Sequence, residues 1–196
     1  NYSNYEICDI ALQLESIFNP LTGYQDTYGC GLGAFKRLIF YKNENPVVKY
    51  LPQKIFNYVD MHLIFTGIKR KSTNILKSFE NEKKDERKEL LLLVKQMENS
   101  LYSEDEKAFF EIITHGWEVK KKISKAIASD IHLLELDNYL KNNRSVLTHR
   151  LCGAGNGGYF LVMTRPNSNF TKEFNKYDQI GIKISVDQFG ATGKIL

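Results

Sequence analysis

The stretch that decides the fold reads Arg150-Leu-Cys-Gly-Ala-Gly-Asn-Gly-Gly-Tyr-Phe-Leu-Val-Met163, a glycine cluster that runs directly into an apolar, β-prone segment. Four of the six residues from Gly153 to Gly158 are glycine, so the backbone can adopt positive φ and approach a ligand closely. The pattern Gly-x-Gly-x-x-Gly is present, but a dinucleotide-binding fingerprint requires a helix after the glycines. Here a strand follows. No Lys-Ser or Lys-Thr pair closes the loop as a P-loop would require.

The glycine cluster is therefore predicted to be the turn of a strand-loop-strand hairpin. Its backbone N–H groups would be exposed, and such a shape suits a phosphate or the edge of a sugar phosphate. A glycine-rich turn that serves only packing is the alternative, and the pattern alone leaves both open.

Composition describes an ordinary globular chain and excludes several classes of function. The 196 residues are 42% hydrophobic and 26% charged, which is enough for one large domain, or for one domain and part of a second. The net charge of +4 is too small and too dispersed to indicate a nucleic-acid partner. No apolar run approaches the roughly 18 residues of a membrane helix. The cysteines, Cys8, Cys30 and Cys152, have no metal-binding spacing, and they favour reduced thiols and a cytoplasmic protein.

Hydrophobic periodicity predicts strands on both sides of a helical block. A helix is expected over residues 5–18, where Asn19-Pro20 ends the pattern. Short strands are expected at 38–41, 47–50, 61–65 and 179–186, and three helices in series lie between residues 90 and 140. This order is typical of an α+β fold and not of a regular βαβα alternation.

Two further segments have the composition of a ligand-binding site. Residues 21–35 form a second glycine-rich segment, in which Asp26 is the single carboxylate among aromatic and small residues. Residues 66–73 place hydroxyls and cations before a helix, which is a common position for anions. Lys120 projects from the centre of an apolar helix face, either because its stem covers that face or because it reaches a phosphate. Trp117, at the border of the same face, is interpreted as a packing residue.

Four motifs in the same order give the chain a resemblance to the galactokinase, homoserine kinase, mevalonate kinase and phosphomevalonate kinase (GHMP) superfamily. They are Gly23-Tyr-Gln-Asp26, Phe65-Thr-Gly-Ile-Lys-Arg70, His115-Gly-Trp-Glu-Val-Lys-Lys-Lys122 and Leu151-Cys-Gly-Ala-Gly-Asn-Gly-Gly158. The segment from His115 to Lys122 is similar to one in bacterial D-glycero-D-manno-heptose phosphate kinases. The resemblance spans essentially the whole chain.

The resemblance implies a kinase that uses ATP and Mg²⁺ to phosphorylate a sugar, in the heptose branch the anomeric hydroxyl of heptose 7-phosphate, as a step toward nucleotide-sugar precursors of surface polysaccharides. Asp26 matches the acidic residue that orients or deprotonates the acceptor hydroxyl. The substrate-binding residues implied are Gln25, Lys69, Arg70 and Lys120. The glycine loop implied to approach substrate and phosphate consists of Gly153, Ala154, Gly155, Asn156, Gly157 and Gly158. No residue is assigned to the metal.

Asn156 stands where the family usually has glycine, which questions a close approach at that point, although Asn tolerates the left-handed conformation better than most residues. A positive φ at Asn156 would show that the departure is tolerated.

The resemblance also implies a domain division, with 1–57 as the remainder of the N-terminal domain and 58–196 as a ferredoxin-like α+β C-terminal domain with added helices. The family's ATP-binding loop, Pro-x-x-x-Gly-Leu-Gly-Ser-Ser, does not occur in these 196 residues. We therefore expect a partner in the missing N-terminal segment of the same kinase, and no ATP turnover by these residues alone. A non-catalytic module that binds a sugar or nucleotide with a sugar-kinase fold is the alternative function. A nucleic-acid binder is a third reading, and no aromatic-basic surface motif supports it.

Overall fold

The structure is a computed structural model, and it describes residues 2–20, 22–41, 44, 46–69, 84–168, 170, 172 and 181–192. The chain divides into two compact units, Asn1–Pro52 with Val186–Leu196, and Gln53–Ser185. Arg70 and the helix predicted around Ile75 and Leu76 lie outside the described residues. The division into 1–57 and 58–196 remains a prediction.

The first unit contains helices α1 (Asn4–Phe18) and α2 (Tyr24–Gly31) and an antiparallel pair of strands, β1 (Lys36–Ile39) and β2 (Val47–Tyr50). Ser3 and Glu6 form a reciprocal capping box that begins α1. The buried core of this unit consists of Cys8, Tyr28 and Leu32. The helix predicted over 5–18 is therefore confirmed.

The apolar stripe of α1 is not the face that the helix buries. Ile10, Leu14, Ile17 and Phe18 keep 40%, 56%, 72% and 87% of their surface exposed. They recur at helical spacing, so they form one continuous stripe. Cys8 is the buried residue of the helix. The residues that predicted α1 from the sequence, Ile7, Ile10, Ala11, Leu14 and Phe18, are likewise not buried among the described residues.

The second unit is built on a four-stranded antiparallel sheet in the order β4-β5-β3-β6. Its strands are β3 (Asp60–Phe65), β4 (Val146–Leu151), β5 (Tyr159–Thr164) and β6 (Gly181–Ile184). Counted along the chain, the strand order across the sheet is 4-1-3-2, which is the order of a ferredoxin-like sheet. The expected α+β class with a ferredoxin-like sheet is confirmed.

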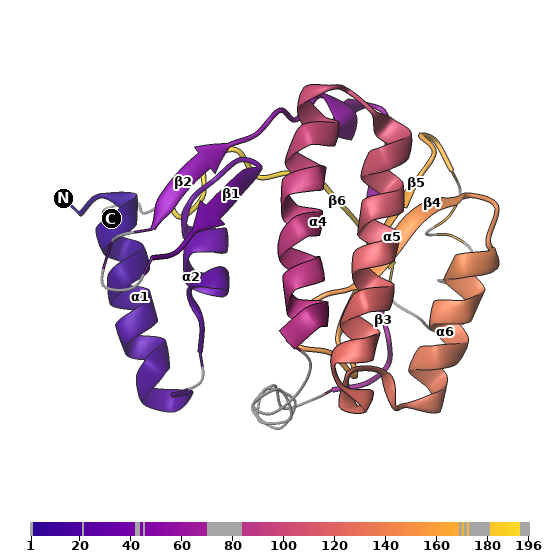
Figure 1. The fold of residues 1–196 in the computed structure, drawn as a ribbon, viewed down its shortest axis with the longest axis horizontal. Coiled ribbons are helices and arrows are strands. Elements are labelled where there is room, and N and C mark those ends of the chain that lie inside the picture. The colour runs from indigo at the N-terminus through magenta and orange to yellow at the C-terminus, as the bar shows by residue number, and fades with distance from the viewer. Residues whose placement is uncertain are drawn as a thin grey trace. The chain divides into compact units, whose positions relative to one another are not determined.

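Within the described residues, three α-helices follow β3: α4 (Lys84–Tyr102), α5 (Glu106–Ile123) and α6 (Ile131–Asn142). The described part of the unit also contains two short 3₁₀ helices, η1 (Lys54–Asn57) and η2 (Lys125–Ala128). Figure 1 shows α4 and α5 side by side, with α6 next to β4. Among the described residues, none of the helices combines the length and apolar character needed for a membrane span.

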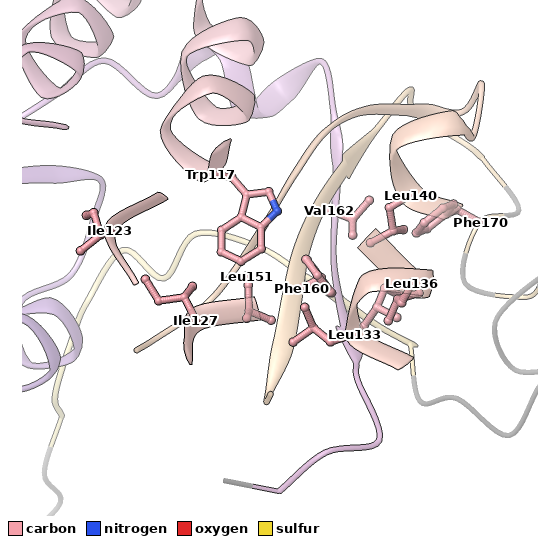
Figure 2. Close-up of a cluster of buried hydrophobic side chains, with 11 residues drawn as sticks. Trp117, Ile123, Ile127, Leu133, Leu136, Leu140, Leu151, Phe160, Val162 and Phe170 are labelled. Carbon is pink, nitrogen blue, oxygen red and sulfur yellow. The ribbon is translucent and has the colours of Figure 1, made fainter. Parts of the chain in front are cut away.

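The core of the second unit lies between the sheet and α5, η2 and α6. Figure 2 shows Trp117 reaching from α5 toward Leu151 and Phe160 of the sheet, with Leu133 and Leu140 of α6 beyond them. Trp117 is only 2% exposed and meets Phe160 edge-on at 6.0 Å between ring centroids. Trp117 is therefore a packing residue, as the sequence predicted. This core fixes β4 and β5, the strands that carry the glycine loop.

Candidate functional site

Asp26 lies in the first turn of α2, three residues after Gly23, whose extended backbone begins the helix. The side chains of Gln25 and Asp26 are both exposed. A carboxylate in the first turn of a helix interacts favourably with the helix dipole. The structure thus presents Asp26 as an accessible anionic group on a regular element. The sequence suggested a site in this glycine-rich stretch but did not predict a helix.

Aromatic contacts hold α2 against the rest of its unit. Tyr28 is 1% exposed, and its hydroxyl donates a hydrogen bond to the carboxylate of Asp9 on α1. Burial, together with that carboxylate, raises the pKa of Tyr28 well above its usual range. Tyr24 stacks on Phe40 with 4.7 Å between ring centroids. These contacts leave Asp26 on a side of the helix away from Tyr24 and Tyr28, because residues two apart do not share a helix face.

The glycine loop joins β4 to β5, as predicted, and it needs unusual backbone angles. Gly153, Gly155, Gly157 and Gly158 all have positive φ, between 69° and 143°. Asn156 also lies in the left-handed region, with φ of 53°. The positive φ at Asn156 confirms that this departure from glycine is tolerated.

Two glycines of the loop are explained by packing alone. A Cβ on Gly155 would lie 2.9 Å from the Cα of Ile127, and one on Gly157 would lie 2.9 Å from the carbonyl oxygen of Ile68. Both distances are shorter than side-chain atoms tolerate, so only glycine fits. The packing alternative left open by the sequence therefore accounts for Gly155 and Gly157.

Asn156 fastens the loop to the start of α6. Its side-chain oxygen accepts hydrogen bonds from the Ser129 N–H, the Ser129 hydroxyl and the Asp130 N–H, each at 3.1 Å. Its own backbone N–H donates to the carbonyl of Ile127. Asn156 therefore adopts the backbone conformation of a glycine, and its hydrogen bonds connect the loop to η2 and to the start of α6.

Backbone N–H groups in the first half of the glycine loop have no hydrogen-bond acceptor within the described chain. Within the described part of the chain, the backbone N–H groups of Gly153, Ala154 and Gly155 donate no hydrogen bond. Gly153 is exposed, whereas Gly155 is buried. Successive N–H groups in a tight turn form a concavity that binds anions. Phosphate contact therefore remains open to this half of the loop.

Positively charged residues lie near the glycine loop in the structure or next to residues that contact it. Lys120 of α5 donates a hydrogen bond from Nζ to the carbonyl of Gly153. Arg150, at the end of β4, lies near enough to act on Cys152: burial raises the pKa of the Cys152 thiol, and the charges of Arg150 and Lys120 oppose that rise. Lys69 is exposed and follows Ile68, which touches the loop. The structure thus brings Lys69, Lys120 and the loop into one region.

Arg150 was not assigned a role from the sequence. Its position three residues before Gly153, on a strand that ends at Leu151, is the signal that could have found it. Arg70, assigned to a sugar-linked phosphate, lies outside the described residues. Asp26 and the glycine loop belong to different units.

The motif between His115 and Lys122 surrounds a buried carboxylate on α6. Asp137, 7% exposed, accepts hydrogen bonds from Trp117 Nε1 at 2.7 Å, from His149 Nε2 at 2.8 Å and from Lys121 Nζ at 2.7 Å. Burial alone would raise the pKa of Asp137, but these partners lower it to about 2. Lys121 also lies 5.2 Å from the centre of the Trp117 ring. The motif is therefore a structural hub that joins α5, α6 and β4, and His115 stands apart from it, paired with Glu89 at 2.7 Å.

Comparison with known proteins places this arrangement in a fold family. No family model matches the chain. It is 28% identical over 178 residues to an L-fucokinase/L-fucose-1-P guanylyltransferase from Bacteroides fragilis, a match that covers 82% of this chain and 18% of that protein. A Campylobacter jejuni protein proposed to be a sugar kinase has a TM-score of 0.69 at 22% identity, covering 96% of this chain and 56% of that one.

A D-glycero-D-manno-heptose 1-phosphate kinase from Bacteroides thetaiotaomicron has a TM-score of 0.63 at 19% identity, covering 99% of this chain and 56% of that one. The fold is therefore that of a small-molecule kinase. More narrowly, it is the GHMP kinase fold, shared with a mevalonate kinase and with the galactokinase of Lactococcus lactis at TM-scores of 0.70 and 0.68. The chain spans just over half the length of these solved structures and less than a fifth of the curated relative.

Proposed function

We propose that the chain is part of an ATP-dependent sugar kinase in which Asp26 orients the acceptor hydroxyl and accepts its proton. The observation that carries the proposal is the accessible carboxylate of Asp26 in the first turn of α2. A carboxylate of ordinary basicity is a weak base toward an alcohol, so holding the hydroxyl in line with the transferred phosphoryl group matters as much as removing its proton. Proton transfer by a placed side chain typically contributes about 10²–10⁴-fold to a rate.

The glycine loop and its cations fit phosphate oxygens. The N–H groups of Gly153, Ala154 and Gly155 supply neutral donors, and Lys120 and Arg150 supply positive charge near them. Arg is suited to a phosphate because its planar fork can donate two parallel hydrogen bonds. We propose that this part of the chain faces a phosphate group, either of the nucleotide or of the sugar.

ATP and Mg²⁺ would supply the γ-phosphoryl group and neutralise the charge that develops on it. Among the described residues, no group of His, Cys, Asp or Glu side chains could hold a metal ion by itself. Mg²⁺ is usually bound through one or two protein carboxylates together with the phosphates of the nucleotide.

The acceptor proposed is a sugar that already carries a phosphate, with heptose 7-phosphate as the first candidate and its anomeric hydroxyl as the site of transfer. Lys69, Lys120 and Arg150 support a phosphorylated acceptor, because their positive charges favour a phosphate group over a neutral hydroxyl. The product, a sugar bearing an anomeric phosphate, would be the substrate of a nucleotidyl transfer toward surface polysaccharides. L-Fucose is the second candidate, from the name of the curated relative.

The exposed stripe of α1 supports a partner for the first unit. Ile10, Leu14, Ile17 and Phe18 present a continuous apolar surface, and such a surface is normally covered in a stable protein. We propose that an N-terminal segment of the same kinase covers it.

The test is release of ADP by the complete kinase polypeptide in the presence of Mg²⁺ and a panel of acceptors: heptose 7-phosphate, L-fucose and D-galactose. Asp26→Asn should lower the rate by about 10²-fold or more without loss of folding. Asp85→Asn is the matched control, because Asp85 also lies in the first turn of a helix and its side chain is exposed. A polypeptide that binds a sugar in calorimetry but never releases ADP would be a sensor, and the proposal would be wrong. Equal rates for wild type and Asp26→Asn would remove Asp26 from the mechanism.

A further inference from the structure

Helix α2 is too weak to hold Asp26 in place unaided. It has eight residues, of which two, Gly29 and Gly31, are glycine. Isolated helices shorter than about 12 residues are marginal in water, and each glycine costs about 1 kcal/mol relative to alanine. The aromatic contacts of Tyr24 and Tyr28 hold one face of α2, and contacts at the far end of the helix add to them in stabilising the turn that carries Asp26.

Lys36 supplies those contacts. Its Nζ lies 3.0 Å from the carbonyl oxygen of Gly29 and 3.4 Å from those of Gly33 and Ala34, and it also donates to the carbonyl of Leu32. The last carbonyls of a helix lack partners within the helix, and a cation there interacts favourably with the helix dipole. Burial lowers the pKa of Lys36, while Cys30, Cys8 and Asp187 act in the opposite direction.

The C-terminal residues of the same unit fasten the end of the helix from a second direction. The N–H of Ala191 donates to the carbonyl of Gly31 at 3.0 Å, and the N–H of Ala34 donates to the carbonyl of Asp187 at 2.7 Å. A Cβ on Gly33 would lie 2.4 Å from the carbonyl oxygen of Gln188, so the two backbones are in direct contact. The end of α2 is thus held by Lys36 on one side and by residues 187–191 on the other.

We propose that Lys36 is a positioning residue for Asp26: it fixes the last turn of α2 and thereby the direction in which the first turn presents the carboxylate. This inference rests on the proposed function, in which Asp26 orients the acceptor hydroxyl. Lys36 itself touches backbone carbonyls and takes no part in the chemistry. Misplacing a reacting group by about 1 Å can cost a rate about a hundredfold, so a small shift of α2 should appear in kcat.

The test compares Lys36→Met with Lys36→Arg in the complete kinase polypeptide. Lys36→Met keeps an unbranched apolar side chain and removes the donor. It should lower kcat about tenfold or more, with the KM for ATP within about twofold of wild type. Lys36→Arg restores a charged multiple donor and should return kcat to within about threefold. Lys54→Met is the matched control, since Lys54 is an exposed lysine in a surface ion pair with Glu104, and such pairs contribute little.

Hydrogen exchange of the α2 amides gives a readout that does not depend on the reaction. In Lys36→Met, the amides of the last turn of α2 should exchange at least about tenfold faster, while those of α5 remain unchanged. If the wild type releases no ADP with any acceptor, the proposed function fails, and the exchange data still decide whether Lys36 holds α2. Unchanged exchange and unchanged kcat in Lys36→Met would overturn the inference. So would a variant that raises KM and leaves kcat intact.

Discussion

The buried carboxylate of Asp137 makes part of the stability of this chain depend on acid pH. In the folded chain its pKa is about 2, against roughly 3.8–3.9 for an aspartate in an unfolded chain. Because the folded pKa is the lower one, the carboxylate stabilises the fold above the unfolded value, and this stability is lost as the pH falls through the folded one. The difference corresponds to roughly 2–3 kcal/mol at neutral pH, of which about 1 kcal/mol is lost by pH 3.

Asp137→Asn removes this dependence. The variant should be less stable than wild type by roughly 2 kcal/mol or more at pH 7, because partly buried Lys121 loses one of its two carboxylate partners and keeps only Glu118. The difference in the free energy of unfolding between wild type and Asp137→Asn should be about 1 kcal/mol smaller at pH 3. Urea unfolding followed by the fluorescence of Trp117, the single tryptophan of the chain, measures both values. Asp85→Asn, at an exposed position, controls for general charge effects. A gap of the same size at both pH values would refute the reasoning.

Two further predictions concern shape and burial. Gly155→Ala should destabilise the chain at least twice as much as Gly67→Ala in thermal unfolding. Both glycines have positive φ, but an added Cβ would contact Ile127 at Gly155 and would meet no atom within 4 Å at Gly67. Equal losses of stability would show that Ile127 moves aside at little cost. Ile17→Asp should destabilise the complete kinase polypeptide by about 2 kcal/mol or more, because the stripe of α1 is proposed to be covered. Leu91→Asp, at a leucine with 71% of its surface exposed, is its control, and equal small effects would mean that the stripe stays in water.

The α+β class, helix α1 and the glycine hairpin followed from periodicity and from the order of turns and strands. These are local signals, because a strand after the glycines is visible in the sequence. The order of the sheet followed from the resemblance, since strand neighbours far apart in the chain leave no local pattern.

Helix α2 was missed for a physical reason. Its glycines lower helix propensity, and the groups that compensate, Lys36 and residues 187–191, come from elsewhere in the chain. The buried partner of Trp117 was missed in the same way, because Asp137 lies on another helix. The apolar stripe of α1 was read correctly as a helix, but its exposure could not be predicted from spacing.

The glycine loop illustrates how a pattern mixes two causes. Gly155 and Gly157 are needed because Ile127 and Ile68 lie against them, whereas Gly153 is exposed and keeps a free donor within the described chain. The sequence offered packing and ligand contact as alternatives for the whole loop. The structure assigns packing to Gly155 and Gly157, and it leaves the backbone N–H groups of Gly153 and Ala154 without an acceptor within the described chain.

The most direct measurement for the proposed kinase is ³¹P NMR of the complete polypeptide with ATP, Mg²⁺ and each acceptor of the panel. The account predicts a new phosphate ester on one sugar that grows in step with ADP, and no such signal above background for Asp26→Asn. A sugar that binds while ATP stays intact, or ADP that accumulates without a phosphorylated sugar, would contradict it.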